Sequence, residues 1–142
     1  MEHQLNRKDF LKFTCNAACG MGLAVAMINL EGCSPFPVIK TKHEKGEIKI
    51  PLLSLKAQKD ILVRDLDLDY DIMLKIKDGK YIILVLKCTH QDWLLSPNSK
   101  GFNCSLHGSS FDTDGKVVNG PAALPLKQLN YTIDEENLVI TL

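Results

Sequence analysis

Two short motifs, Cys88-Thr89-His90 and Cys104-Ser105-Leu106-His107, lie thirteen residues apart in this sequence. Each motif offers one thiol and one imidazole, and the other three of the chain's five cysteines all lie within the first 33 residues. A disulfide framework would distribute an even set of cysteines through the domain. Lone cysteines that are closely followed by a histidine are instead typical of metal ligands. The two motifs therefore predict a metal centre bound by Cys88, His90, Cys104 and His107.

The region from residue 47 onward has the pattern of an all-β domain. Turn residues recur about every ten positions, and the runs between them are β-branched and aliphatic. Strands are expected at residues 48–55, 61–66, 72–76, 81–86, 129–133 and 138–142, with hairpin turns at residues 78–79, 114–115 and 134–137. Asp112 and Asp114 are expected as turn residues rather than as catalytic acids. No helical periodicity of useful length follows residue 46, so both ligand motifs are expected in loops that leave strand ends.

The sequence around the second motif extends this pattern beyond the four ligands. Residues 107–112 read His-Gly-Ser-Ser-Phe-Asp, and residues 119–126 read Asn-Gly-Pro-Ala-Ala-Leu-Pro-Leu. With the two motifs, these segments resemble the Rieske iron–sulfur family, specifically over residues 88–126 and loosely, through the strand pattern, over residues 47–142. The resemblance implies a Rieske-like antiparallel β-sandwich with two cluster-binding loops. It also implies one two-iron two-sulfur (2Fe–2S) cluster per subunit.

The same resemblance implies a role for individual residues. Two thiolates, here Cys88 and Cys104, would hold one iron, and two imidazoles, here His90 and His107, would hold the other. Ser109 matches a serine that lies near the cluster in the family. The segment Gly120 to Ala122 matches a loop that shields the cluster from water.

The ligand set also determines the charge of the implied centre. Two ferric ions, two sulfides and two thiolates sum to zero, so the first added electron makes the centre only singly negative. Reduction is therefore easier than for an all-thiolate cluster, and the potential rises from about −400 mV toward roughly −150 to +300 mV.

Two departures separate this chain from the quinol-oxidising members of the family. Those members carry one extra cysteine in each ligand loop, joined as a disulfide, whereas the matching positions here are Trp93 and Leu106. They also place a tyrosine near the cluster where this chain has Phe111. Loss of one hydrogen-bond donor weakens stabilisation of the reduced state, so an intermediate potential is expected. Trp93 is expected as a core aromatic beside its ligand loop rather than as an electron relay or a partner contact.

Residues 1–33 have the pattern of a signal or membrane-anchor segment. Residues 6–12, Asn-Arg-Lys-Asp-Phe-Leu-Lys, resemble a twin-arginine export motif with Lys8 in place of the second arginine, and residues 14–30 form an uncharged apolar run. This run either stays as an anchor, at the low end of the roughly 17–25 residues that span a bilayer, or is cleaved before Cys33. Residues 30–33 resemble a lipoprotein box in which Glu31 is unusual, and lipid attachment at Cys33 is favoured over an uncleaved anchor. A buried N-terminal helix is the remaining alternative.

Export by either route predicts a domain outside the cytoplasm that remains attached to the cytoplasmic or outer membrane. Residues 34–46, which begin Ser-Pro-Phe-Pro and continue as a polar run, are expected as the tether, and residues 47–142 as the 2Fe–2S domain. The predicted function is single-electron transfer, by a membrane-tethered carrier or by the iron–sulfur subunit of an exported oxidoreductase of quinol–cytochrome type. The expected partner is a redox protein or a quinol-oxidising complex.

Two other functions fit the four ligands. A Rieske ferredoxin that feeds an oxygenase would also lack the disulfide, although it needs no apolar leader. A zinc-stabilised interaction module would use the same residues, because two cysteines and two histidines also satisfy tetrahedral zinc.

Charge and missing motifs argue against further classes. Lys and Arg together number 17, as do Asp and Glu, so the chain has no basic excess to follow a phosphate backbone. Nucleic acid is therefore not an expected partner. The sequence shows no nucleophile with a base, no carboxylate pair and no phosphate loop, so no catalysis by this chain alone is expected.

Overall fold

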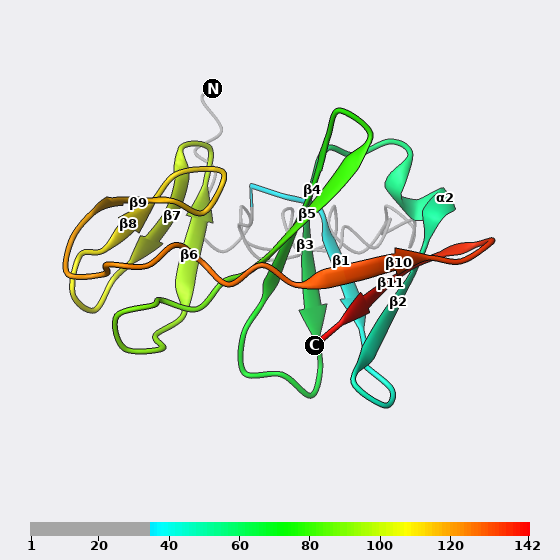
Figure 1. The fold of residues 1–142 in the computed structure, drawn as a ribbon, viewed down its shortest axis with the longest axis horizontal. Coiled ribbons are helices and arrows are strands. Elements are labelled where there is room, and N and C mark those ends of the chain that lie inside the picture. The colour runs from blue at the N-terminus through cyan, green and yellow to red at the C-terminus, as the bar shows by residue number, and fades with distance from the viewer. Residues whose placement is uncertain (1–34) are drawn as a thin grey trace, which may run out of the picture. The chain divides into compact units, whose positions relative to one another are not determined.

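Three small sheets make up the described part of the chain, residues 35–142 of a computed structural model (Figure 1). Their strand orders are β1-β3-β4-β5, β10-β11-β2 and β6-β7-β8-β9. The elements are β1 (Val38–Thr41), β2 (Glu47–Pro51), α2 (Leu52–Leu55), β3 (Asp60–Asp65), β4 (Ile72–Lys77), β5 (Lys80–Val85), β6 (Leu95–Asn98), β7 (Gly101–Cys104), β8 (Ser110–Phe111), β9 (Val117–Asn119), β10 (Asn130–Ile133) and β11 (Asn137–Thr141). The all-β prediction is confirmed.

The sheet of β3, β4 and β5 lies between the other two and is buried on both faces (Figure 1). Successive side chains of a strand point to opposite faces, so each of these strands supplies two cores. On β4, for example, Ile72 and Leu74 belong to one core, whereas Met73 between them belongs to the other. Burial on both faces explains why these strands read as continuous apolar runs rather than as alternating patterns.

One face of this central sheet packs against β2 and β11 to form a β-sandwich. β2 and β11 are antiparallel and place Ile48 opposite Ile140 and Ile50 opposite Leu138, and all four side chains are fully buried. Fully burying a side chain of this size stabilises a fold by about 1.5–3 kcal/mol. The closing hairpin of β10 and β11, predicted from the sequence, completes this sheet.

The opposite face of the central sheet packs against the sheet of β6 to β9; the first ligand motif lies between β5 and β6, and the second follows β7. Its core includes Phe102 of β7 and Phe111 of β8, which are register partners, together with Leu84 and Leu86. The β6–β7 hairpin, which turns between Asn98 and Gly101, lies inside the spacer between the motifs. No strand was expected in this spacer from the sequence, so the hairpin was not predicted.

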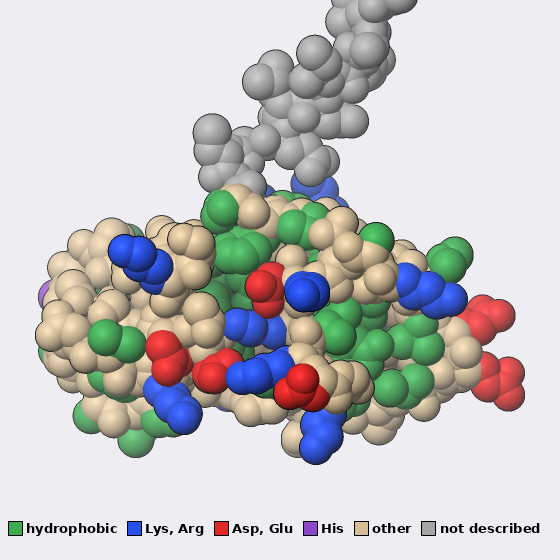
Figure 2. Space-filling view, turned by 90° about the horizontal axis from the view of Figure 1, so that it is seen from above, with side chains coloured by type: hydrophobic (Ala, Val, Ile, Leu, Met, Phe, Trp, Pro, Cys, Tyr) green, Lys and Arg blue, Asp and Glu red, His purple; other side chains and the backbone are tan. Residues whose placement is uncertain are grey.

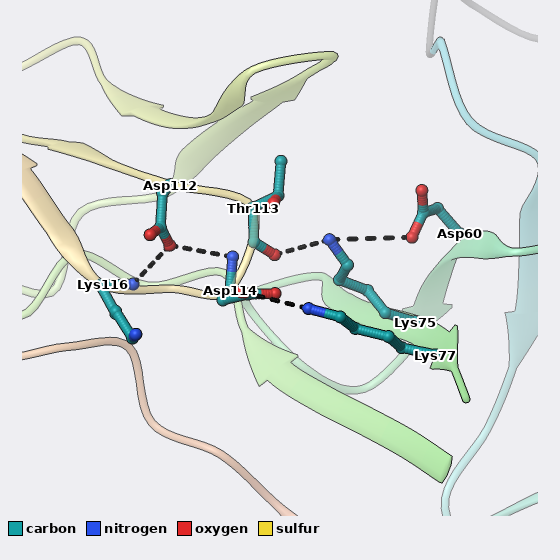
Figure 3. Close-up of polar contacts among 7 residues, drawn as sticks. All are labelled: Asp60, Lys75, Lys77, Asp112, Thr113, Asp114 and Lys116. Atoms are coloured by element: carbon teal, nitrogen blue, oxygen red, sulfur yellow. Dashed lines mark hydrogen bonds and ion pairs between the residues drawn. The ribbon is translucent and has the colours of Figure 1, made fainter. Parts of the chain in front are cut away.

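Lysine side chains of β4 attach the β8–β9 turn to the central sheet (Figure 3). Lys75 Nζ donates a hydrogen bond to the Thr113 carbonyl oxygen at 2.6 Å and lies 3.9 Å from an Asp60 carboxylate oxygen. Lys77 Nζ lies 3.5 Å from an Asp114 carboxylate oxygen.

The turn itself is organised by Asp112. Its Oδ1 accepts hydrogen bonds from the backbone N–H groups of Asp114 and Lys116, both at 2.9 Å (Figure 3). Asp112 and Asp114 are therefore turn residues, as predicted, and Gly115 completes the turn with a φ of 81°.

Two segments differ from the sequence expectation. The expected tether, residues 34–46, contains β1, which pairs in parallel with β3 and places Val38 opposite Leu62. The expected strand 48–55 ends at Pro51, where the pairing of β2 with β11 stops, and continues as the short helix α2. The backbone N–H of Leu52 still donates to the Glu136 carbonyl oxygen at 2.8 Å as the chain turns away.

The predicted signal or anchor segment, residues 1–33 with Cys33, lies outside the described residues. Within residues 35–142, the structure contains no helix with the length and apolar composition that a bilayer crossing requires. On the face drawn in Figure 2, basic and acidic side chains are interspersed over the middle of the described part of the chain.

Candidate metal centre

The first ligand loop follows β5 and is closed by backbone hydrogen bonds at its base. The N–H of Cys88 donates to the Trp93 carbonyl oxygen at 2.7 Å, and the N–H of Asp92 donates to the Cys88 carbonyl oxygen at 2.8 Å. Asp92 adopts a φ of 51°, a conformation that aspartate tolerates better than most residues, and this reverses the chain. His90 therefore lies on a short loop whose two ends are fixed to each other.

The second ligand loop follows β7 and is closed in the same way. The N–H of Cys104 donates to the Ser109 carbonyl oxygen at 2.8 Å, and the N–H of Gly108 donates to the Cys104 carbonyl oxygen at 3.2 Å. Gly108 has a φ of 75°, which a residue without Cβ adopts at little cost. His107 thus occupies the second loop as His90 occupies the first.

The four predicted ligands form two pairs, one of imidazoles and one of thiols. His90 Nδ1 and His107 Nδ1 are 3.2 Å apart, and the two rings meet edge to face at 86°. The Cys88 and Cys104 side chains are within hydrogen-bond reach of each other, and both residues are buried. His107 is exposed and His90 is partly exposed. The thiols therefore face the protein interior, and the imidazoles lie toward solvent.

This arrangement fits the donor set of the 2Fe–2S cluster that the sequence resemblance implies. Two nitrogens bound to one metal ion at about 2.1 Å, at a tetrahedral angle, are about 3.4 Å apart. The observed Nδ1–Nδ1 distance of 3.2 Å is close to this value. The two cysteines are free thiols rather than a disulfide, as ligation requires.

Backbone dipoles around Cys104 favour its thiolate. Burial alone would raise the pKa of the Cys104 thiol, but the backbone N–H groups of His107 and Leu106 and the side chain of Cys88 lower it, and the net pKa is lowered. A metal ligand must be deprotonated, so this environment prepares Cys104 for ligation.

The segment that follows β9 joins the two ligand loops. Its Ala122 N–H donates to Ser109 Oγ of the second loop at 3.2 Å, and its Leu124 carbonyl oxygen accepts from Thr89 Oγ1 of the first loop at 2.6 Å. Gly120 lies so close to the second loop that a Cβ at this position would be 2.4 Å from Ser109 Cα. We call residues 119–124 the bridging segment, since it connects the two loops without a disulfide.

The structure also gives the positions of three other residues that the sequence singled out, Ser109, Phe111 and Trp93. Ser109 and Phe111 are buried beside the second loop. Trp93, which was expected in the core, has 48% of its surface exposed, so that expectation is wrong. Its backbone carbonyl oxygen accepts the hydrogen bond from the Cys88 N–H, while the side chain points outward.

Thr89 was not predicted as a residue of the site, because nothing in the sequence indicates that its hydroxyl donates a hydrogen bond to a carbonyl oxygen 35 residues later.

Comparison with known proteins places this chain in a known family. The family model described as the Rieske [2Fe-2S] domain matches residues 54–130, which is more than half of the chain. A cytochrome b6-f complex iron-sulfur subunit of Synechococcus sp. (strain CC9605) is 39% identical over 65 residues, covering 44% of this chain and 36% of that protein. The mitochondrial cytochrome b-c1 complex subunit Rieske of Solanum tuberosum is 32% identical over 69 residues, covering 46% of this chain and 26% of that protein.

A solved structure has the same fold. The plasma membrane Rieske protein of the cyanobacterium Synechocystis PCC 6803 aligns with a TM-score of 0.51 at 20% identity, covering 67% of this chain and 99% of that one. The chain thus spans about a third or less of the length of the two curated relatives, whereas it covers nearly all of this structure.

Proposed function

The chain belongs to the Rieske [2Fe-2S] domain family, and from this we propose that Cys88, His90, Cys104 and His107 hold its 2Fe–2S cluster for single-electron transfer. The observations that carry this assignment are the pairing of two imidazoles, whose Nδ1 atoms are 3.2 Å apart, and the pairing of two buried thiols. The cluster supplies a one-electron redox centre. The chain's own residues set its orientation, its access to solvent and its potential.

The imidazole side of the centre is the proposed route for electrons. Electron transfer favours a ligand that reaches the protein surface, and His107 is exposed whereas Cys88 and Cys104 are buried. The bridging segment is fixed to both loops through its hydrogen bonds to Thr89 and Ser109. Ser109 Oγ accepts one hydrogen bond within the described residues, so its own hydrogen remains available to stabilise a reduced, more negative centre.

Exposed apolar side chains on and beside the two ligand loops, called here the apolar rim, are the proposed docking surface for the redox partner. It consists of Trp93, Leu94, Leu106 and Leu124, each with 47% to 66% of its surface exposed. Leu106 precedes His107, and Leu124 is hydrogen-bonded through its carbonyl oxygen to Thr89 next to His90. Exposed aromatic and aliphatic side chains grouped on one surface mark binding sites. The rim therefore offers a partner a direct approach to both imidazoles.

We further propose that the chain works outside the cytoplasm as a membrane-attached carrier or as the iron–sulfur subunit of a quinol-oxidising complex. The export pattern of residues 1–33 supports attachment and export. The similarity to subunits of cytochrome b6-f and b-c1 complexes supports a partner of that class.

Low-temperature electron paramagnetic resonance of the dithionite-reduced full chain tests the cluster assignment. Histidine ligation predicts a rhombic signal with a lower average g than an all-thiolate 2Fe–2S cluster gives. His107→Ala should abolish this signal. A colourless, signal-free protein that contains stoichiometric zinc would overturn the electron-transfer function.

A further inference from the structure

A buried carboxylate lies at the end of β3, outside the ligand loops. The Asp65 side chain has no exposed surface. Its Oδ1 lies 3.0 Å from His43 Nδ1 and accepts the Asp67 backbone N–H at 2.9 Å. Its Oδ2 is buried and has no hydrogen-bond partner among the described residues.

An unsatisfied oxygen of this kind is unusual and points to a missing partner. Nearly all buried polar atoms in folded proteins are hydrogen-bonded, and the exceptions often mark a site for water or an ion. A buried negative oxygen without a donor is costly unless a cation compensates it.

The neighbouring side chains complete a metal-binding donor set. His43, from the β1–β2 connection, and Asp67, from the turn after β3, each bring a ligand atom, and with Asp65 these atoms lie within 4.8 Å of one another. One imidazole nitrogen and two carboxylates suit first-row divalent cations, whereas Ca²⁺ and Mg²⁺ prefer sites made of oxygen alone.

We propose that His43, Asp65 and Asp67 form a second metal site, separate from the cluster, that binds a first-row divalent cation such as Zn²⁺. Ligands of one tetrahedral ion lie about 3.4 Å apart, so the set must contract from its present separation. Asp67 can supply this movement because 43% of its side-chain surface is exposed. The other two ligands already touch.

Lys42 is paired with one of the three ligands, Asp67, in the present arrangement. Its Nζ lies 3.2 Å from an Asp67 carboxylate oxygen, and its side chain is 66% exposed, so it can leave when a metal enters. Substitutions at neighbouring positions should therefore have opposite effects on the affinity for the metal. Loss of Asp67 or His43 weakens metal binding, and loss of the Lys42 charge strengthens it. A simple His43–Asp65 ion pair predicts neither effect.

The test is calorimetric titration of ZnCl2 into the full chain loaded with its 2Fe–2S cluster, which keeps the cluster ligands occupied. We expect one added Zn²⁺ per chain. His43→Gln and Asp67→Asn should each weaken binding by at least about tenfold, and Lys42→Gln should tighten it roughly two- to fivefold. Asp69→Asn, two residues further along the same acidic run, is the matched control and should leave the affinity unchanged. The visible absorption of the cluster reports that each variant is folded.

Two results would overturn the site. One is a wild-type chain that takes up no Zn²⁺. The other is binding that persists in both His43→Gln and Asp67→Asn, as it would if the metal bound to Cys15 and Cys19 in the N-terminal segment.

Discussion

The hydroxyl oxygen of Ser109 accepts a hydrogen bond from the backbone N–H of Ala122 at 3.2 Å, and both residues are buried. This contact joins the second ligand loop to the bridging segment. Ser109 is a ligand-loop residue whose hydroxyl hydrogen is still available to donate. Its side chain therefore both holds the bridging segment to the second loop and can stabilise the negative charge of the reduced centre.

Ser109→Ala should lower the midpoint potential of the cluster. The variant removes one hydrogen-bond donor that stabilises the reduced state, and a net bond of about 1 kcal/mol corresponds to roughly 50 mV for one electron. Redox titration followed by electron paramagnetic resonance measures the shift. Ser110→Ala, the next residue and the first of β8, is the control and should leave the potential near that of wild type. Equal shifts in both variants would contradict a specific role for Ser109.

Phe111→Tyr should raise the midpoint potential, by roughly 50 mV, because it restores a hydroxyl beside the second ligand loop. The wild-type midpoint should accordingly lie below about +250 mV, near the upper end of the range for this cluster type. Phe102→Tyr adds the same hydroxyl to the register partner of Phe111 in the same core, and it controls for effects of the added volume. A wild-type midpoint above that limit would disprove the interpretation of Phe111.

Gly120→Ala should destabilise the domain and loosen its cluster. The added Cβ would lie 2.4 Å from Ser109 Cα, and the backbone φ of 102° is one that alanine rarely adopts. We expect a loss of more than about 2 kcal/mol in the free energy of unfolding, because backbone strain and overlap add. Denaturant unfolding followed by cluster absorbance and by circular dichroism measures it.

Gly79→Ala is the matched control for this variant. Gly79 has a φ of 74° but nothing within 4 Å of the added Cβ, so it reports the cost of strain alone, about 1 kcal/mol. Similar losses in the two variants would show that the contact with Ser109 is unimportant.

Lys75→Met should weaken the attachment of the β8–β9 turn to β4 (Figure 3). The Lys75 side chain is only 13% exposed, and its loss leaves the Thr113 carbonyl oxygen without this donor. We expect a loss of about 1–2 kcal/mol in the free energy of unfolding. Lys77→Met removes the partner of Asp114, and because Lys77 is more exposed than Lys75, the free energy of unfolding should fall by less than about 0.5 kcal/mol. If the two variants lost similar free energy of unfolding, the difference in burial between Lys75 and Lys77 could not be the cause of their different contributions.

Asp134 should make stability depend on pH in acid. Backbone N–H groups of Glu136 and Asn137 lower the pKa of this carboxyl in the β10–β11 turn. A carboxyl whose pKa is lower in the folded than in the unfolded state stabilises the fold at pH values above the usual aspartate pKa of about 4. This stabilisation is lost as the pH falls through the pKa of the folded state. Thermal unfolding of Asp134→Asn should therefore show a smaller loss than wild type on acidification. Parallel curves for the two proteins would argue against the prediction.

The all-β fold, which the structure confirms, and the proposed ligand set were both read from local signals in the sequence. Cysteine–histidine spacing and strand–turn alternation are readable in one segment at a time. β1 was missed because its pairing with β3 is parallel and joins residues that are far apart in the chain, such as Val38 and Leu62. The roles of the individual ligands stay predictions until the loaded protein is measured.

The remaining misses also concern contacts that no local pattern encodes. The exposure of Trp93 depends on the closure of its loop by a backbone bond from Cys88. The meeting of His43 with Asp65 depends on how the β1–β2 connection returns to the end of β3. Turn chemistry, in contrast, was read correctly at Asp112, since an aspartate that binds the N–H groups after it is itself a local signal.

The double-faced central sheet limits how this electron-transfer unit could be reused in protein engineering. If residues 86–128 were excised and grafted onto another scaffold, the ligand loops would lose Leu62, Met73 and Leu84, which fill the core beneath them. A one-residue shift of β4 would exchange the side chains of both cores at once. A minimal carrier built from this chain must therefore retain the central sheet, and redesign of its partner specificity should be confined to the exposed tips of the loops.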